Sequence, residues 1–128
     1  MKEHHEKTEV EGSVDFTLDY DKSLFLAEPH GMINPSIVAE DLKQATIFAE
    51  KTQRPWTYCT NTSDVKLVNP LNILFLKEIK KLKNLKQIVV YAPTLGNRLL
   101  IRLIGPIFKP DRIIKDELTF RSFVSRGI

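Results

Sequence analysis

The chain has 128 residues, of which 42% are hydrophobic and 27% are charged. These values are typical of one folded domain, and they exclude a disordered tail protein, a collagen-like fibre and a small disulfide-framed protein. The net charge of +3 is unevenly distributed, because residues 1–64 carry 6 basic and 12 acidic side chains whereas residues 65–128 carry 13 and 4. The first half is acidic and the second half is basic.

The N-terminal segment differs in composition from the rest of the chain. Residues 1–12 are almost wholly polar, and we expect a disordered leader there, followed by a single domain over 13–128. The leader does not resemble a secretory signal, and a lone cysteine, Cys59, cannot form an internal disulfide. The longest strongly apolar stretch, 99–108, is too short to span a bilayer. We expect a cytoplasmic protein, with peripheral binding at the inner membrane face left open.

The domain begins with the pattern of a β-hairpin. Apolar and polar residues alternate over 13–20, which predicts a half-buried strand. A turn leads to a second apolar run over 24–27, and Pro29, His30 and Gly31 are expected to end that strand.

Strands and helices alternate after the hairpin. Asn34 and Pro35 predict a helix start, because asparagine caps free N–H groups and proline in the first turn has none to satisfy. The expected elements are a helix over 35–51, a strand over 56–60, a connector over 61–69, a helix over 70–83, a strand over 88–91, a helix over 94–108, a strand over 112–114 and a helix over 116–123.

This β-β-α-β-α-β-α-β-α order predicts an α/β fold, a single domain in which a mixed, mostly parallel sheet is backed by helices. Gly105 and Pro106 are expected to kink or end the helix that contains them.

The sequence shows no familiar catalytic or metal-binding pattern. Its glycines do not cluster into a phosphate-binding loop, and no cysteine or histidine pair has the spacing of metal ligands, so we expect no metal and no cofactor. Cys59 is expected to be a buried and unreactive thiol, and His30 to lie in a turn. An enzyme that uses either residue is the least favoured hypothesis.

The second and third predicted helices carry more apolar side chains than one core-facing stripe requires, together with most of the basic residues. Such a surface suits an apolar or lipid-like ligand with an anionic head, or an anionic membrane surface. The alternative is that the apolar residues complete the core. Nucleic acid is disfavoured because the basic residues are interleaved with aliphatic rather than aromatic side chains. The candidate ligand-binding residues are Ile73, Leu76, Arg98, Leu99, Leu100, Arg102, Leu103, Ile104, Ile107 and Phe108, with Arg98 and Arg102 for the anionic head.

The order of elements, the strand and loop over 56–64 and the closing pattern over 112–123 resemble the STAS superfamily. The closer resemblance is to its stage II sporulation protein AA-like branch of small stand-alone bacterial proteins. The resemblance implies a mixed sheet backed by helices. It also implies two activities: binding of a partner-switching kinase by sporulation regulators, and binding of apolar small molecules or membrane surfaces by the stand-alone branch.

The sporulation regulators carry a phosphorylatable serine, usually in an Asp-Ser pair at the start of the helix after the third strand. This chain has the reverse order, Ser63-Asp64, several residues before the predicted helix start at Asn69-Pro70. The resemblance therefore implies a protein-interaction module of the anti-anti-sigma-factor type without the usual phosphorylatable serine. Its candidate partner-binding residues are Thr60, Thr62, Ser63 and Asp64.

Two functional hypotheses follow. The leading one is a non-enzymatic binding module for an apolar or lipid-like small molecule, or for an anionic membrane surface. The alternative is the protein-interaction regulatory module, with a protein partner bound around residues 60–67.

Overall fold

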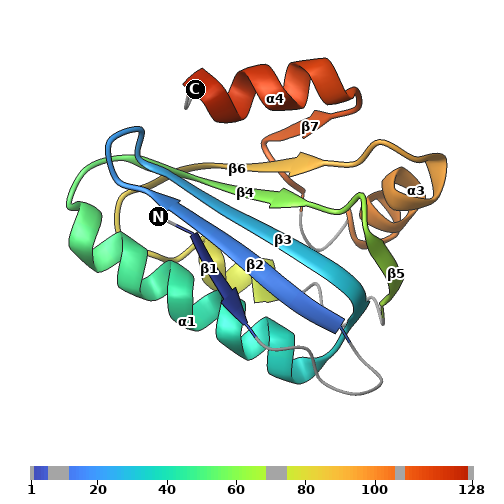
Figure 1. Cartoon of the computed structure of the whole chain (residues 1–128), viewed down its shortest axis with the longest axis horizontal. Coiled ribbons are helices and arrows are strands. Elements are labelled where there is room, and N and C mark those ends of the chain that lie inside the picture. The colour runs from blue at the N-terminus through green and yellow to red at the C-terminus, as the bar shows by residue number, and fades with distance from the viewer. Residues whose placement is uncertain (1, 6–11, 69–74, 106–108, 127–128) are drawn as a thin grey trace.

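A computed structural model describes residues 2–5, 12–68, 75–105 and 109–126 (Figure 1). Its strands are β1 (Lys2–His5), β2 (Gly12–Asp19), β3 (Leu24–Ile33), β4 (Trp56–Asn61), β5 (Val65–Val68), β6 (Leu85–Tyr91) and β7 (Arg112–Ile114). Its helices are α1 (Pro35–Thr52), α2 (Leu76–Ile79), α3 (Leu95–Ile104) and α4 (Glu117–Arg126).

All seven strands form one sheet in the order β1-β2-β3-β4-β6-β7, with β5 pairing with β3 off this path. The β1–β2 and β2–β3 pairs are antiparallel, and the β3–β4, β3–β5, β4–β6 and β6–β7 pairs are parallel. The predicted α/β class with a mixed, mostly parallel sheet is confirmed.

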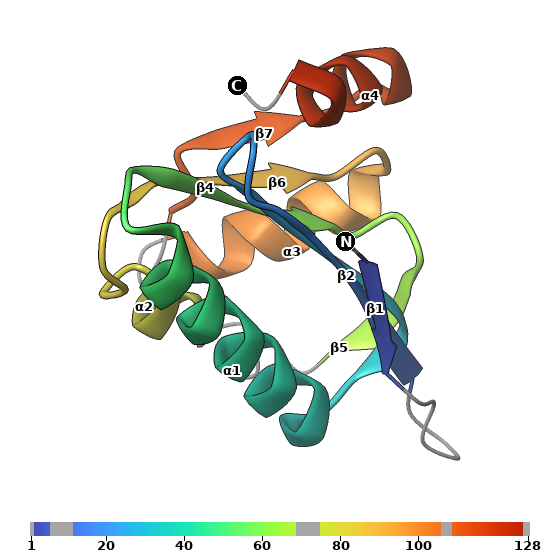
Figure 2. The same ribbon diagram turned by 60° about the vertical axis from the view of Figure 1, so that its left-hand side comes forward.

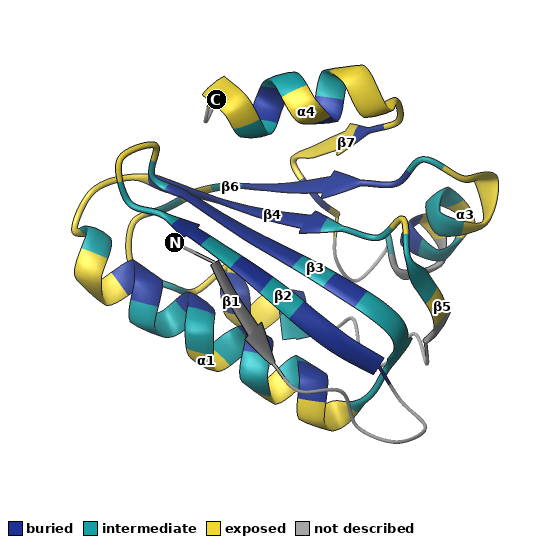
Figure 3. Ribbon diagram, in the orientation of Figure 1, coloured by how far each residue is buried: buried dark blue, intermediate teal, exposed yellow. Residues whose placement is uncertain are grey.

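The helices cover the two faces of the sheet unequally. Helices α1 and α2 pack on one face, where alternate side chains of β2, β3, β4 and β6 form the larger core. Ile101 of α3 packs on Val90 and Ala92 at the end of β6. Helix α4 packs on the opposite face through Phe120 and Phe123 (Figures 1 and 2). The central strands are buried from both sides, as Figure 3 shows.

Aromatic side chains hold α1 to the sheet. Phe48 of α1 lies edge-on to Trp56 of β4, with ring centroids 5.3 Å apart. Phe25 of β3 stacks on Tyr58 of β4 at 5.4 Å, and its ring also meets Phe48. All four side chains are fully buried, so the register of α1 along β3 and β4 is fixed by their packing.

Side chains cap the first turn of three helices, and the cap at Asn34 is as predicted. Asn34 Oδ1 accepts a hydrogen bond from the Ile37 N–H at 2.9 Å, and the hydroxyl oxygen of Thr94 and the carboxylate of Asp116 cap α3 and α4 in the same way. Helix α3 ends at Ile104, before the end of the helix expected over 94–108 and at the place where Gly105 and Pro106 are expected to kink or end it, and residues 106–108 lie outside the described residues. Helix α4 continues to Arg126, three residues beyond its expected end.

The N-terminal half contains two departures from expectation. Lys2–His5, assigned to the disordered leader, pair with β2 as the antiparallel strand β1. Without β1, the free N–H and C=O groups of β2 would form the edge of the sheet, and such an edge readily accepts another strand. Residues 1 and 6–11 of the expected leader lie outside the described residues.

Strand β3 also continues to Ile33, so the expectation that Pro29 to Gly31 end the strand is wrong. In β3, residues 28–30 pair with β2 but lie between the segments that pair with β4 and β5, where a proline interrupts fewer ladder bonds. Gly31, with φ of 82°, precedes the register shift at Met32.

The segment between β4 and β6 also differs. The expected connector contains β5, whose Val65–Val68 pair with the end of β3. The expected helix over 70–83 is helical only over α2 in its described part, and residues 69–74 lie outside it. Successive i→i+3 hydrogen bonds and a left-handed Asn84 (φ 62°) turn the chain into β6. The Trp56 indole N–H donates to the Lys83 carbonyl at 2.8 Å and holds this turn.

No helix within the described residues is long and apolar enough to cross a membrane.

Replacing Asn34 tests the predicted cap of α1. We expect Asn34→Ala to lower the free energy of unfolding by about 1 kcal/mol, because the Ile37 N–H loses its acceptor. Asn34→Asp should cause no loss, because it keeps the acceptor oxygen and replaces the Nδ2 group, which has no hydrogen-bond partner in the structure. Urea unfolding followed by far-ultraviolet circular dichroism measures both. Equal losses in the two variants would contradict the cap.

Candidate functional site

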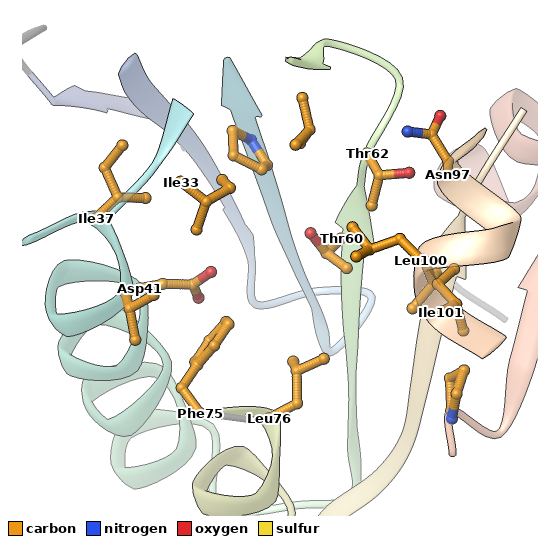
Figure 4. Close-up of a pocket in the computed structure, with 15 residues that line it drawn as sticks. Ile33, Ile37, Asp41, Thr60, Thr62, Phe75, Leu76, Asn97, Leu100 and Ile101 are labelled. Atoms are coloured by element: carbon orange, nitrogen blue, oxygen red, sulfur yellow. The ribbon is translucent and has the colours of Figure 1, made fainter. Parts of the chain in front are cut away.

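A partly enclosed cavity of about 70 Å³ lies between α1, α2, α3 and the ends of β3, β4 and β6. Its walls are almost wholly apolar. Figure 4 shows side chains from α1 on one side, from α2 below and from α3 on the other side pointing toward one space. The described residues that line it are Pro29, Ile33, Ile37, Val38, Asp41, Thr60, Thr62, Val65, Phe75, Leu76, Val90, Asn97, Leu100, Ile101 and Pro110.

The cavity contains one carboxyl group, that of Asp41. Asp41 lies on the buried side of α1 and is only 4% exposed. Its Oδ2 accepts a hydrogen bond from the Tyr58 hydroxyl at 2.8 Å, whereas its Oδ1 has no hydrogen-bond partner among the residues that the structure describes. Burial raises the pKa of Asp41 to about 7, although the Tyr58 hydrogen bond acts in the opposite direction.

The other polar groups of the cavity come from the strand ends and α3. The Thr62 hydroxyl donates to the Tyr91 carbonyl at 2.8 Å, and the side chain of Thr60 lies beside that of Tyr58. Asn97 lies on the α3 side near Thr62 (Figure 4), and its Oδ1 is buried without a hydrogen-bond partner. The cavity therefore joins apolar walls to two unsatisfied polar atoms.

The predicted ligand-binding residues divide into three groups. Leu76 and Leu100 line the cavity. Leu99 is 51% exposed, Arg102 is exposed, and the Arg98 guanidinium donates to the carbonyls of Ala92 and Pro93, so none of these three lines it. The remaining predicted side chains lie outside those that the structure describes, namely Ile73, Leu103, Ile104, Ile107 and Phe108.

The sequence reasoning did not identify Asp41 as a site residue. A signal was present, because Ile37, Asp41, Ala45 and Phe48 follow one another at helical spacing on the buried stripe of α1. An acid in the middle of an apolar stripe is a buried polar group that needs a partner.

A second polar cluster lies around His30 on β3. Its Nδ1 is 2.7 Å from Asp64 Oδ2 and its Nε2 is 2.9 Å from Asp15 Oδ2, so the imidazole bridges two carboxylates. Burial alone would lower the pKa of His30, but the hydrogen bonds and charges of Asp64 and Asp15 outweigh it and raise that pKa above 6.5. The same hydrogen bond lowers the pKa of Asp64. The expectation that His30 lies in a turn is wrong, because it lies within β3.

The predicted partner-binding residues point in two directions. Thr60 and Thr62 line the cavity, whereas Ser63 is exposed and Asp64 is half exposed. The Ser63 N–H donates to Asn61 Oδ1 at 2.9 Å, and the Asp64 carbonyl accepts from the Gly31 N–H at 2.9 Å. The Ser63-Asp64 turn is therefore held by hydrogen bonds at both of its residues.

Cys59 is fully buried on β4, and burial raises the pKa of its thiol well above the usual value, as expected for an unreactive cysteine. No group of three or more histidine, cysteine or acidic side chains in the described part of the chain is placed to hold a metal ion.

No protein-family model matches the chain, and no curated protein matches its sequence. Solved structures are similar to it in fold. The structure of the anti-sigma factor antagonist SpoIIAA in its unphosphorylated form matches with a TM-score of 0.66 and 10% sequence identity, over 90% of this chain and 99% of that one. Apo-SiaC from Pseudomonas aeruginosa matches with a TM-score of 0.55 and 12% identity, over 91% of this chain and 99% of that one. The chain has the STAS fold, as its order of elements predicts.

The His30 bridge predicts a pH-dependent contribution to stability. Because folding raises the pKa of His30, the protonated imidazole stabilises the fold below pH 6.5, and this contribution is lost as the pH rises through the folded-state pKa. We expect the loss of unfolding free energy caused by His30→Gln to be larger at pH 6 than at pH 8. Urea unfolding at both pH values measures it. An equal loss at both would show that the bridge does not hold a charged imidazole.

Proposed function

We propose that this protein is a regulatory protein-interaction module that binds an anti-sigma factor. The observation that carries the proposal is the fold shared over nearly the whole chain with a structure named as an anti-sigma factor antagonist. The exposed Ser63-Asp64 turn is the candidate contact surface.

The geometry of this turn favours protein recognition. The hydrogen bonds to Asn61 and Gly31 fix its backbone, and the Asp64 carboxylate also contacts His30 and lies 3.5 Å from Lys66 Nζ. A turn that is already ordered loses little conformational entropy when a partner docks on it.

The charge around the turn indicates the kind of partner. Side chains of β2 and β3 alternate between the two faces of the sheet, and those on the face away from α1 near this turn include Asp15 and Glu28. Together with Asp64 they give this surface three carboxylates, against the two basic groups, Lys66 and His30, that contact them. A partner with basic side chains is complementary to it.

A charge change at Ser63 tests the proposed surface. We expect Ser63→Arg to weaken binding of the anti-sigma factor at least tenfold, because it places a bulky positive charge against a basic partner. Ser125→Arg is the matched control, since Ser125 is exposed near the C-terminal end of α4, which lies away from the turn that precedes β5 (Figure 1). Partners are captured on the immobilised chain and identified by mass spectrometry, and the captured anti-sigma factor is then titrated by calorimetry. Failure to capture one, or equal affinities of the two variants, would refute the proposal.

We propose a second function, binding of an apolar small molecule, because the cavity has apolar walls and is bordered by Leu76 and Leu100 from the predicted set. The cavity volume of about 70 Å³ is several times the roughly 10–15 Å³ that one water molecule requires. The cavity supports this function better than the exposed side of α3, where Leu95 and Leu99 are the large apolar side chains with strong exposure among those of the helix whose burial the structure describes.

Two adjacent leucines of α3 distinguish binding in the cavity from binding on the exposed surface of the helix. Leu100 lines the cavity, whereas Leu99 is exposed. We expect Leu100→Trp, which fills the cavity, to weaken binding of ethylbenzene at least fivefold, whereas Leu99→Trp should leave it unchanged. Titrations followed by amide chemical shifts in nuclear magnetic resonance spectra measure both. Sedimentation with anionic liposomes is the parallel test for a membrane surface. If Leu99→Trp alone alters binding, or if only liposomes are bound, the cavity is not the site.

A further inference from the structure

Of the two carboxyl oxygens of Asp41, one accepts a hydrogen bond from a described residue and the other does not. Tyr58 donates to Oδ2, and Thr60, whose side chain lies beside that of Tyr58, does not reach Oδ1. Within the described part of the chain Oδ1 has no hydrogen-bond partner, and Figure 4 shows the carboxyl group pointing from α1 toward the space between α2 and α3. A buried acceptor in this state is costly, because burial removes its hydrogen bonds to water.

The walls near Asp41 do not supply the missing donor. The described lining residues are mostly apolar, Thr62 donates to the Tyr91 carbonyl, and the unpartnered atom of Asn97 is itself an oxygen, an acceptor. A molecule that enters the cavity and donates a hydrogen bond would satisfy Oδ1 while its carbon skeleton contacts the apolar walls. This combination of apolar walls and one oriented polar group is typical of small-molecule sites.

We propose that the cavity binds a small apolar molecule carrying a hydroxyl group, whose O–H donates a hydrogen bond to Asp41 Oδ1. The proposal rests on the second function proposed above and adds to it the chemical class of the ligand and the residue that selects it.

The protonation state of Asp41 makes the selectivity dependent on pH. With a pKa of about 7, Asp41 is mostly ionised at pH 8 and accepts hydrogen bonds only, whereas at pH 6 it is mostly protonated and can also donate one. Tyr58 on β4 is the titratable group that faces it, and burial raises the pKa of Tyr58 well above 10, so Tyr58 stays protonated at both pH values. No other described lining residue is ionisable.

Three probes with one carbon skeleton test the proposal: 1-phenylethanol carries a donor, acetophenone only an acceptor, and ethylbenzene neither. Titrations at pH 8, followed by the amide shifts of Leu100 and Ile101, give the affinities. We expect 1-phenylethanol to bind about tenfold more tightly than acetophenone, because one hydrogen bond to a buried charged group is worth about that factor. In Asp41→Asn the amide oxygen accepts from Tyr58 and the NH₂ group faces the cavity, so the preference should reverse.

Asp21→Asn is the matched control, because Asp21 is exposed in the turn between β2 and β3, and it should keep the preference of the unmodified chain. If Asp41→Asn does not fold, the unmodified chain at pH 6 gives the second measurement, and the preference for 1-phenylethanol should fall severalfold there. Equal binding of the alcohol and the ketone at pH 8 would overturn the proposal but leave apolar ligand binding intact, provided that ethylbenzene binds. No binding of any probe would overturn both.

Discussion

The packing of Phe48 between Trp56 and Phe25 is the contact on which the arrangement of this protein depends. The three rings join α1 to β3 and β4, and Phe25 stacks in turn on Tyr58. Each aromatic pair of this kind contributes about 0.5–1.5 kcal/mol beyond the burial of its surface. Because all four rings are fully buried, α1 cannot slide or rotate on the sheet without breaking several contacts at once.

This fixed helix determines where Asp41 lies. Asp41 is seven residues before Phe48, two helical turns along the same stripe, so the packing that buries Phe48 also directs Asp41 toward the sheet. Tyr58 lies two residues after Trp56 on the same face of β4, and its hydroxyl donates a hydrogen bond to Asp41. The aromatic cluster thus buries a carboxyl group and supplies only one of its hydrogen bonds. The second oxygen belongs to a side chain that lines the cavity, together with Leu76 of α2 and Ile101 of α3.

Local signals explain why much of the fold was predictable. The caps at Asn34, Thr94 and Asp116 and the alternation over Val14 to Leu18 depend on residues close in sequence, and the structure contains them. The exceptions depend on pairing between distant segments. Strand β1 is formed by its pairing with β2, and β5 by its pairing with β3. Helix α2 ends at Ile79, before the end of the expected helix, and the Trp56 indole holds the Lys83 carbonyl in the turn that follows.

The candidate site was less accessible to sequence reasoning for the same reason. Counting apolar residues on the second and third predicted helices located two cavity walls, at Leu76 and Leu100, but it assigned Arg98 to a ligand when its guanidinium is bound to backbone carbonyls. The opposite wall of the cavity comes from α1. This helix lies in the acidic half of the chain, whereas the predicted ligand-binding residues were chosen from helices of the basic half. The His30 bridge joins carboxylates 15 and 34 residues away along the chain, and no local pattern marks such a contact.

The two proposed functions use opposite sides of one short segment. From β4 into the following turn, Thr60 and Thr62 face the cavity, whereas Ser63 and Asp64 face solvent. Thr62 holds the Tyr91 carbonyl through both its N–H and its hydroxyl, which anchors the segment to β6 between the two sites. A ligand in the cavity would therefore contact the residue immediately before the exposed turn. The anchoring residue lies between the two sites, so the two proposed functions can be separated by variants on either side of Thr62.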